Sequence, residues 1–507
     1  MAISNPGPGH SGTTGSLNSV PASKKATLSS NYIDFTSSAG SWAQQYLPDL
    51  MEKEAEVFGP RTISGFLAQV GAEEAMQSDQ VVWSEQGRLH LSYTGTFDTN
   101  IAGQTFTITN DIDGNTISTD EHGVRINDMC IVATAEGAIK MHVIAVTNNA
   151  LTMRAYEVAT VDAAAAFTDT GANEPATLLV IGSEYIKGTQ GPGGTSSATD
   201  GYGTVKPTHT SFTNKPIIIK DYYEVSGSDT TAIGWVEVTG EAGQSGYLWY
   251  LKAEGDTRSR FSDYLEMTML EAVKGVPGAS TLDGESAANS SQFPATNAPF
   301  GTEGLFAAIE TRGNITTGVT GVNASTDLAE FDAILAEFDS QGAIEENMMF
   351  VNRSTSLAMD DMLASMNSYG AGGTSYGVFD NSEDMALNLG FSGFRRGSYD
   401  FYKSDMRYLN DKATRGGINS RATSAAIRGV IVPAGTSTVY DQALGKNLKR
   451  PFLHVRYRAS QTDDRRMKTW VTGSVGAATS ALDAMQLHFL TERCLITQGA
   501  NNFMLMK

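Results

Sequence analysis

The chain has 507 residues, enough for two to four structural units. Charged residues make up only 18% and hydrophobic residues 40%, with 52 glycines, which is typical of a β-rich packed protein and not of a disordered one. The formal net charge of −20 disfavours a dedicated nucleic-acid binder, because such proteins carry a basic face.

Signals for export, membrane insertion and disulfide formation are not predicted. Met1–Gly15 has neither a basic start nor an apolar run, so we expect no secretion signal. No stretch approaches the roughly 20 apolar residues that a membrane span needs. Cys130 and Cys494 suggest neither a disulfide framework nor a zinc cluster, and a reducing compartment is expected.

The N-terminal segment is polar and small. Residues 1–40 are mostly Gly, Ser, Thr, Pro and Asn, and such a segment cannot bury enough apolar surface to order itself. It is either a disordered tail or an arm that becomes ordered against neighbouring subunits. Two helical patterns follow between residues 41 and 70.

A β-rich block spans residues 85–240. Ile139–Val143 alternates apolar and polar side chains, as a half-buried strand does, and an Asn-Asn turn leads into a second such run at Leu151–Ala155. Further turn signals recur at similar spacing. The block therefore predicts a small barrel-like insertion between roughly 100 and 185.

A single long helix is predicted next, from about Gly246 to Lys274. Its apolar residues recur every four positions, at Phe261, Leu265, Met269 and Val273. At 1.5 Å per residue the helix would be about 40 Å long. A helix of this length in a β-rich protein is typical of a spine.

Residues 300–470 mix helical and strand patterns. An amphipathic helix pattern at 328–338 precedes a buried strand at Met348–Val351, and a second helix begins near Ser354. Further strands are expected at Leu387–Leu389, Tyr399–Phe401, Gly429–Val432 and Phe452–Tyr457. This order predicts a sheet with helices on its faces.

The closing segment is unusually apolar. Ala484–Ile496 and Phe503–Met506 are two strand-like runs, joined by a turn-like stretch at Gly499–Asn502. Terminal residues usually fray because they make few contacts. We therefore expect this segment to be buried, either in the chain's own fold or in a neighbouring subunit.

No catalytic, cofactor or metal site is predicted, and we do not expect an enzyme. The seven histidines are scattered, and no Cys-x-x-Cys pair occurs. Asp111–Asn115 resembles a calcium loop but lacks its sixth-position glycine and twelfth-position glutamate, which favours a plain Asp-Gly turn. Gly370–Gly373 lacks the Lys-Ser/Thr pair of a phosphate-binding loop. Acidic pairs such as Asp360-Asp361 are expected on solvated faces.

One region is basic within this acidic chain: from Arg395 to Lys468, sixteen Lys or Arg stand against six Asp or Glu. Its densest part, which includes His454, gives the subunit-interface candidates Lys446, Lys449, Arg450, Arg456, Arg458, Arg465, Arg466 and Lys468. Contact with acidic patches of neighbouring subunits is favoured over genome contact, because no aromatic stacking platform accompanies the cluster. A plain solvated surface is the third reading.

This reading predicts the effect of one double substitution. Reversing the charges of Arg465 and Arg466 is expected to block assembly and to leave the monomer folded.

The order of parts resembles the major capsid proteins of tailed bacteriophages of the Hong Kong 97 type. Gln486–Ile496, with its Glu492-Arg493 pair, looks like the closing segment of that family. Met348–Met366, a buried strand followed by a helix, resembles the start of its axial domain. The same resemblance makes crAss-like and other large marine phages plausible relatives.

The resemblance implies an α+β fold in five parts. These are an N-terminal arm at 1–60, an extended β loop at 61–240 carrying the inserted small β-barrel domain, a peripheral domain with the spine helix at 241–300, an α/β axial domain at 301–470, and C-terminal return strands of the peripheral domain at 471–507. The insertion is larger than a minimal extended loop needs. The arm is too short for the built-in scaffolding domain of some members.

The resemblance also implies a function. Copies of the chain would form hexamers and pentamers of an icosahedral head in the virion, enclosing double-stranded DNA as non-specific cargo, after assembly in the host bacterial cytoplasm. The partners would be the chain itself and decoration, portal and scaffolding proteins, with no cofactor and no membrane. The alternatives are another phage structural protein, such as a decoration or tail-tube subunit, or a secreted carbohydrate-binding β-protein. The missing signal and the absence of recognisable paired carboxylates count against the last of these.

Overall fold

The structure is a computed structural model. It describes residues 72–88, 92–98, 104–119, 121–135, 137–158, 173–187, 209–228, 237–239, 245–275, 301–342, 344–367, 393–421, 423–434, 436–441, 446–474 and 478–507. The predicted arm at 1–60, the helical patterns at 41–70, the glycines at 370–373 and the strand at 387–389 lie outside these residues. The chain divides into two compact units, one of residues 82–212 and one that combines 1–81 with 213–507.

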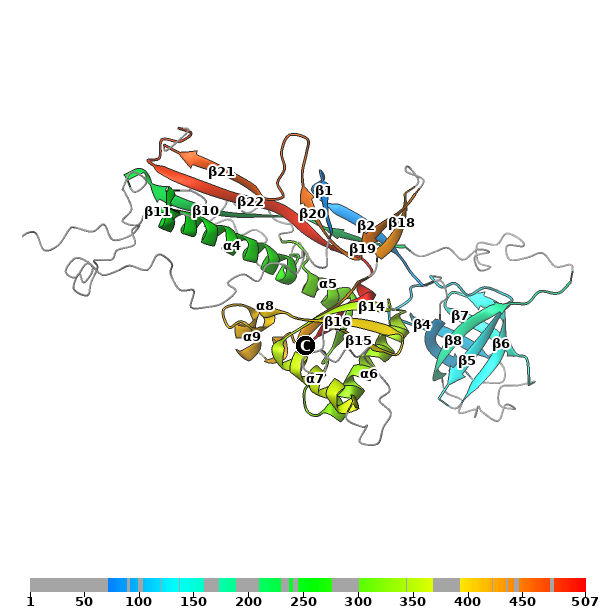
Figure 1. Cartoon of the computed structure of the whole chain (residues 1–507). Helices are drawn as coiled ribbons and strands as arrows, with labels where there is room; N and C mark the ends of the chain where they lie inside the picture. The colour runs from blue at the N-terminus through cyan, green and yellow to red at the C-terminus, as the bar shows by residue number, and fades with distance from the viewer. Residues whose placement is uncertain are drawn as a thin grey trace, which may run out of the picture. The chain divides into compact units, whose positions relative to one another are not determined.

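The unit of residues 82–212 contains a closed six-stranded barrel (Figure 1). Its strands are β3 (Ser92–Asp98), β4 (Thr105–Asp111), β5 (Asp128–Thr134), β6 (Ala138–Thr147), β7 (Ala150–Ala155) and β8 (Asn173–Ser183), joined in the order β3-β4-β7-β6-β5-β8. Alternate residues of these strands fill the interior, among them Phe97, Phe106 and Leu151, which are fully buried. The expected small barrel is confirmed, although its first strand begins earlier, at Ser92.

The local sequence pattern predicted a hairpin of this unit correctly. The predicted hairpin is β6 paired with β7, and Asn148 makes its turn with a positive φ of 52°, a conformation that asparagine tolerates better than most residues. Before and after the barrel, β2 (Val81–Gln86) and β9 (His209–Asn214) pair as a two-stranded ribbon. The rings of Trp83 and Phe212 lie 6.1 Å apart on it.

The larger unit contains a five-stranded sheet built around one long strand, β22 (Ala484–Thr497). β10 (Ile217–Ser226) lies along one edge of β22, and β20 (Leu453–Arg458) and β21 (Lys468–Gly473) follow one another along the other. β1 (Ala72–Met76) adds to β20 in parallel. Figure 1 shows the spine helix α4 (Leu248–Glu271) running along this sheet.

The predicted apolar stripe of the spine helix is confirmed in part. Phe261, Leu265 and Met269 are buried, and Phe261 packs with Leu487 and Phe489 of β22. Val273 is 69% exposed, because the helix ends before it. A short pair of strands, β11 (Glu237–Thr239) and β12 (Ser245–Tyr247), precedes the helix.

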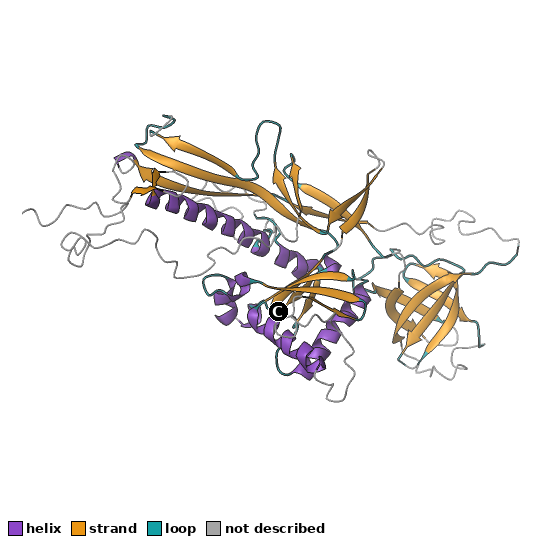
Figure 2. Cartoon of the chain, in the orientation of Figure 1, coloured by secondary structure: helices purple, strands orange, loops and turns teal. Residues whose placement is uncertain are grey.

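A second, six-stranded sheet carries helices (Figure 2). Its strands, in spatial order, are β13 (Asn314–Thr316), β23 (Met504–Met506), β17 (Gly429–Pro433), β14 (Glu346–Val351), β16 (Tyr399–Asp405) and β15 (Gly393–Arg396). α6 (Ala324–Gln341) and α7 (Arg353–Asn367) share one apolar core with it, which includes Phe331, Phe338 and Met359. The predicted helix-flanked sheet is confirmed.

The remaining elements are short. α5 (Leu305–Arg312) joins the end of α4 to the six-stranded sheet, and α8 (Arg407–Asn410) and α9 (Arg415–Arg421) follow β16. β18 (Thr436–Asp441) pairs with β19 (Lys446–Pro451), and two 3-10 turns lie at 423–425 and 500–502.

Two strands belong to other sheets than the sequence suggested. We expected Phe452–Tyr457 in the helix-flanked sheet, but β20 pairs with β22 in the five-stranded sheet, as does β21. β23, expected to return to the sheet of the spine helix, instead enters the helix-flanked sheet between β13 and β17. The reason is a shared core that contains Leu453, Leu495 and Leu505, so an apolar strand is buried equally well on either side of it.

A buried asparagine at the end of β9 connects separate segments of the larger unit. Asn214 is fully buried, and its Nδ2 donates to the carbonyl oxygens of Glu303 (3.1 Å) and Leu495 (2.7 Å). Its Oδ1 accepts from the backbone N–H of Lys215 and Glu303, both at 2.9 Å, and from the hydroxyl of Thr302 at 3.1 Å. One side chain therefore satisfies polar groups from three separate segments.

Substituting Asn214→Leu is expected to destabilise the protein by about 3 kcal/mol or more, because it leaves several buried backbone groups without partners. Urea unfolding followed by tryptophan fluorescence measures the loss. Thr302→Val, which removes only one of these bonds, is the matched control and should cost about 1 kcal/mol. Equal midpoints for N214L and the unmodified protein would contradict this role.

Candidate subunit-contact surface

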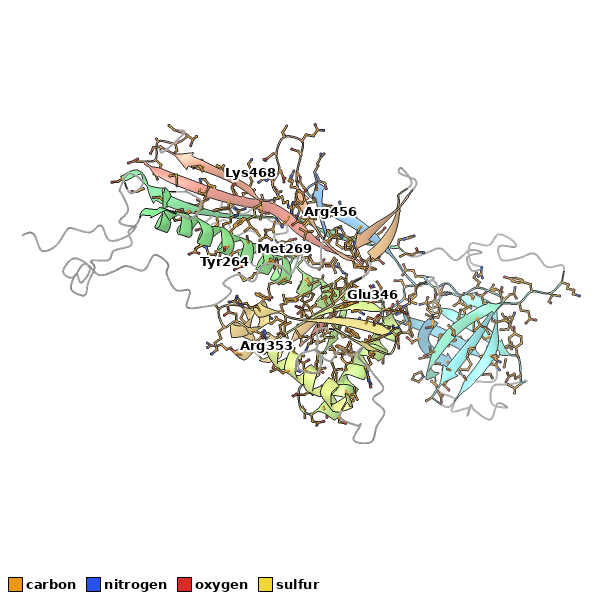
Figure 3. The ribbon with its side chains drawn as sticks, in the orientation of Figure 1. Tyr264, Met269, Glu346, Arg353, Arg456 and Lys468 are labelled. Carbon is orange, nitrogen blue, oxygen red and sulfur yellow. The ribbon has the colours of Figure 1, made fainter. Side chains whose placement is uncertain are left out.

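The predicted basic cluster lies mainly on the five-stranded sheet and on the loop between β20 and β21. Figure 3 labels Arg456 and Lys468 on this sheet. Lys446, Lys449 and Arg450 belong to β19, and their side chains lie outside the described part of the structure. His454 is 1% exposed and is part of the interior.

A buried carboxylate organises two of these arginines. Glu492 of β22 is 4% exposed. Its Oε2 lies 2.9 Å from Nε of Arg465, and its Oε1 accepts from Nη1 of Arg458 at 3.2 Å. Because Arg465 is in the loop after β20, this carboxylate fixes the loop to the sheet.

A second carboxylate holds the edge strand β1. Glu73 is paired with Arg466 (2.5 Å) and with Arg493 (3.3 Å). Arg493 is 5% exposed, and burial lowers the pKa of its guanidinium while Glu73 opposes that effect. Its Nη2 also donates to the carbonyl oxygen of Arg466 at 2.6 Å. Glu492 and Arg493, although adjacent in sequence, therefore form ion pairs with different residues: Glu492 with Arg458 and Arg465, and Arg493 with Glu73.

Arg456, Arg458 and Lys468, the other candidates whose side chains the structure describes, also have partners within the chain. Arg456 contacts Glu74 at 2.7 Å, Arg458 donates to Asp79, and Lys468 contacts Asp463 at 2.6 Å. These salt bridges connect the edge of the sheet and its loops within a single chain. The expectation that reversal of Arg465 and Arg466 leaves the monomer folded therefore needs revision, because both side chains support intrachain structure.

Three rings line up across the sheet on the face opposite α4. His488 stacks on Trp470 (centroids 5.1 Å apart) and on Tyr222 (6.0 Å apart). Nε2 of His488 lies 2.8 Å from the hydroxyl of Thr472. Side chains alternate along a strand, so His488 points away from the helix that covers Leu487 and Phe489. Sequence reasoning missed this row, since its members come from three strands.

The structure shows where the candidate chemical motifs lie. Asp111 accepts from the backbone N–H of Asp113 (3.0 Å) and Asn115 (2.9 Å), and Gly114 has a φ of 84°, so the calcium-like segment is an Asp-stabilised turn. Asp360 is not on a solvated face, since it forms a largely buried ion pair with Lys403 of β16. Among the described residues no group of His, Cys, Asp and Glu is placed to hold a metal ion. None of the described helices is long and apolar enough to cross a membrane.

Both thiols are buried, and burial raises the pKa of Cys130 and of Cys494 to about 12. They are therefore neutral at pH 8. We expect neither to react with a thiol reagent at that pH in the native protein, and both to react in denaturant, because the thiolate is the reactive form. Counting released thionitrobenzoate in the two conditions checks this.

Neither a protein-family model nor a curated protein matches the chain. Solved structures are similar to it. A structure from Microbacterium phage Oxtober96 is 10% identical, with 91% of this chain and 96% of that chain covered and a TM-score of 0.36. The capsid structure of the cyanophage P-SCSP1u is 8% identical, with 96% and 98% covered and a TM-score of 0.37. The mature capsid of bacteriophage PhiM1 is 9% identical, with 64% and 78% covered and a TM-score of 0.29. All three come from phages, and two are named as capsids.

Proposed function

We propose that this chain is the major capsid protein of a phage, the repeated subunit of an icosahedral head. The observation that carries the proposal is the construction of the larger unit. A spine helix of 24 residues packs on a sheet centred on β22, and the chain then continues through β23 into a helix-flanked sheet. The sequence resemblance led us to expect these parts, and residues from both sheets and from the spine helix share one apolar core.

The parts can be assigned within this proposal. Residues 1–60 would be the arm, and 61–240 the extended loop, with the ribbon β2–β9 carrying the barrel. The peripheral domain would comprise 241–300 and β22, together with β20 and β21, since these pair with β22. The axial domain would be the rest of 301–470, completed by β23.

The assembly would consist of hexamers and pentamers of this chain around double-stranded DNA, formed in the bacterial cytoplasm and retained in the virion. Scaffolding, portal and decoration proteins are the further partners that such a head needs. No catalytic step is required of the chain, and its acidity would limit adhesion to the packaged DNA.

The basic candidates have a place in this proposal. Arg456, Arg458, Arg465, Arg466 and Lys468 would shape the rim of the five-stranded sheet, where their partly exposed guanidinium and ammonium groups can still meet a neighbour. Lys446, Lys449 and Arg450 on β19 would extend that rim. Each such contact would be weak in isolation, and the stability of the lattice would come from their sum.

Electron microscopy of the purified full-length chain over a range of concentrations tests the proposal. Closed isometric shells or hexameric and pentameric rings are the expected result. Tubes would instead indicate a tail-tube subunit. A monomer at every concentration, with and without the other head proteins of its phage, would refute a capsid role.

A further inference from the structure

The long strand β10 lies at an edge of the five-stranded sheet. It pairs along its whole length with β22, and no described strand pairs with its other side. Figure 1 shows β22 between β21 and β10. The edge is ten residues long, and Ile218 and Tyr222 on it are 50% and 56% exposed. A long strand edge with apolar side chains is a site at which another strand can pair.

Two hydrogen bonds show which backbone groups β10 presents at this edge. The N–H of Gly227, directly after the strand, donates to the carbonyl oxygen of Asp483, its partner in the register with β22. Hydrogen-bonded pairs alternate in an antiparallel ladder, so the odd-numbered residues of β10 bond to β22. The N–H of Tyr222 accordingly donates to its neighbour, Oδ1 of Asp221, at 2.9 Å. The even-numbered residues therefore direct their N–H and C=O groups toward the open edge.

The side chains of these even-numbered residues form a self-complementary pattern. Lys220 and Glu224 lie two residues before and two residues after Tyr222, on the same face of the strand, and both are exposed. Lys220 is in no ion pair with the described residues, and Glu224 accepts from the amide of Gln486 at 2.7 Å. In a second, antiparallel β10 centred on Tyr222, Lys220 of each copy would lie directly opposite Glu224 of the other.

Charge favours this register over its neighbours. A two-fold axis at Lys220 or at Glu224 would set each of these residues opposite its own copy, and an axis at Asp221 would set two carboxylates opposite each other. With the axis at Tyr223, neither Lys220 nor Glu224 faces an opposite charge. Opposite charges across antiparallel strands are stabilising and like charges are destabilising. The axis at Tyr222 is therefore the one that these side chains select.

The layer beneath this edge is exposed as well. Arg260 of α4 pairs with Asp221 of β10 at 3.1 Å, so this side of the spine helix is directed toward β10. Tyr264, which Figure 3 labels, lies one turn later on the same side of the helix and is 45% exposed. A partner at the β10 edge would also cover this aromatic side chain.

We propose that two copies of this chain pair through β10, antiparallel about a two-fold axis at Tyr222, so that their two sheets become one. The N–H of Tyr222 donates to the carbonyl oxygen of the same residue in the other copy, while Asp221 keeps its ion pair with Arg260. Two Lys220–Glu224 pairs fix the register. The contact is isologous, since both copies use the same surface. It goes beyond the proposed function, because it needs two copies only, with or without a shell.

Charge reversal tests the side-chain pairs. Lys220→Glu and Glu224→Lys, each alone, set like charges opposite one another twice and should raise the dissociation constant of the pair about tenfold or more, measured by analytical ultracentrifugation of the full chain. An equimolar mixture of the two variants should associate like the unmodified protein, because every contact then joins opposite charges. The double variant K220E/E224K should do the same. Single variants that associate as strongly as the unmodified chain would contradict the pairing.

Lys220→Ala distinguishes this contact from the opposite role of an edge lysine. Lysines at strand edges often prevent pairing with another chain, and removal of such a lysine strengthens association. In the proposed pair the substitution removes two ion pairs instead, and the dissociation constant should rise about threefold or more. Stronger association of K220A would overturn the proposal.

Cross-linking tests the register directly. Tyr222→Cys should form a disulfide-linked dimer on oxidation. Lys220→Cys in one preparation and Glu224→Cys in another should link when mixed, and neither should link alone, because each lies four residues out of register with its own copy. Thr469→Cys, exposed on β21 of the same sheet, is the matched control and should stay monomeric. The native thiols do not interfere, since both are buried.

The outcomes separate this contact from the capsid role. If the cross-linked pair forms and no shell does under any condition, the contact stands and the capsid role fails. If shells form and none of these cysteine pairs links in them or in solution, the contact is wrong and the capsid role stands. An unmodified chain that neither dimerises nor assembles at any concentration would refute both.

Discussion

Deleting Met504–Lys507 is expected to abolish folding of the larger unit. β23 is an interior strand, and Met504, Leu505 and Met506 are at most 1% exposed. Met504 and Met506 belong to the core under α6 and α7, whereas Leu505 belongs to the core shared with the spine helix. Removal of four residues therefore opens cavities on both faces of the sheet, and β13 loses the strand with which it pairs.

The single substitution Leu505→Ala should cost about 2–5 kcal/mol, the usual range for truncating a buried leucine. Thermal unfolding by circular dichroism measures this loss, and solubility on expression reports the deletion. Lys507→Ala is the control. It removes an exposed ion pair with Glu310 and should change stability by about 1 kcal/mol or less. A soluble deletion variant with an unchanged midpoint would show that β23 is dispensable.

Neutralising Glu492 is expected to have the second largest effect. Glu492→Gln removes the negative charge that faces Arg458 and Arg465 and leaves two guanidinium groups close together at a partly buried site. Breaking a fully buried pair costs about 3–5 kcal/mol, and because both arginines are about one-third exposed we expect about 2–3 kcal/mol here. Urea unfolding gives the value, and faster proteolysis within the β20–β21 loop should accompany it.

Asp79 provides a matched comparison, because it pairs with the same Arg458 but is 86% exposed. Asp79→Asn should therefore change stability by less than about 1 kcal/mol. Equal losses for the two variants would mean that burial of the carboxylate is not what matters. Arg465→Glu should resemble E492Q or exceed it, since it sets two carboxylates against each other.

Local periodicity predicted the elements of this fold well. The stripe of Phe261, Leu265 and Met269 indicates a long helix, and alternation at 139–155 indicates a hairpin, because both signals depend only on neighbours in the sequence. Sheet membership could not be predicted in the same way. β20 and β23 are apolar strands that either sheet could bury, and long-range pairing decided between them.

The candidate subunit-contact surface likewise combines features that local sequence predicts with features that depend on long-range contacts. A count of charges found the basic cluster, but Glu73 lies far from Arg466 in the sequence, and Glu492 is isolated in an apolar strand. The sequence therefore suggested a surface free for partners where the structure has intrachain pairs.

The long strand β22 and the short strand β23 are synthesised after every strand with which they pair. Neither sheet of the larger unit can be completed while its earlier strands are being synthesised, because each still lacks a strand from the end of the sequence. β10 and β17 therefore keep an unpaired backbone edge until β22 and β23, respectively, have been synthesised. Unpaired strand edges can pair wrongly with other chains, so this fold is most exposed to aggregation before β22 and β23 have been made.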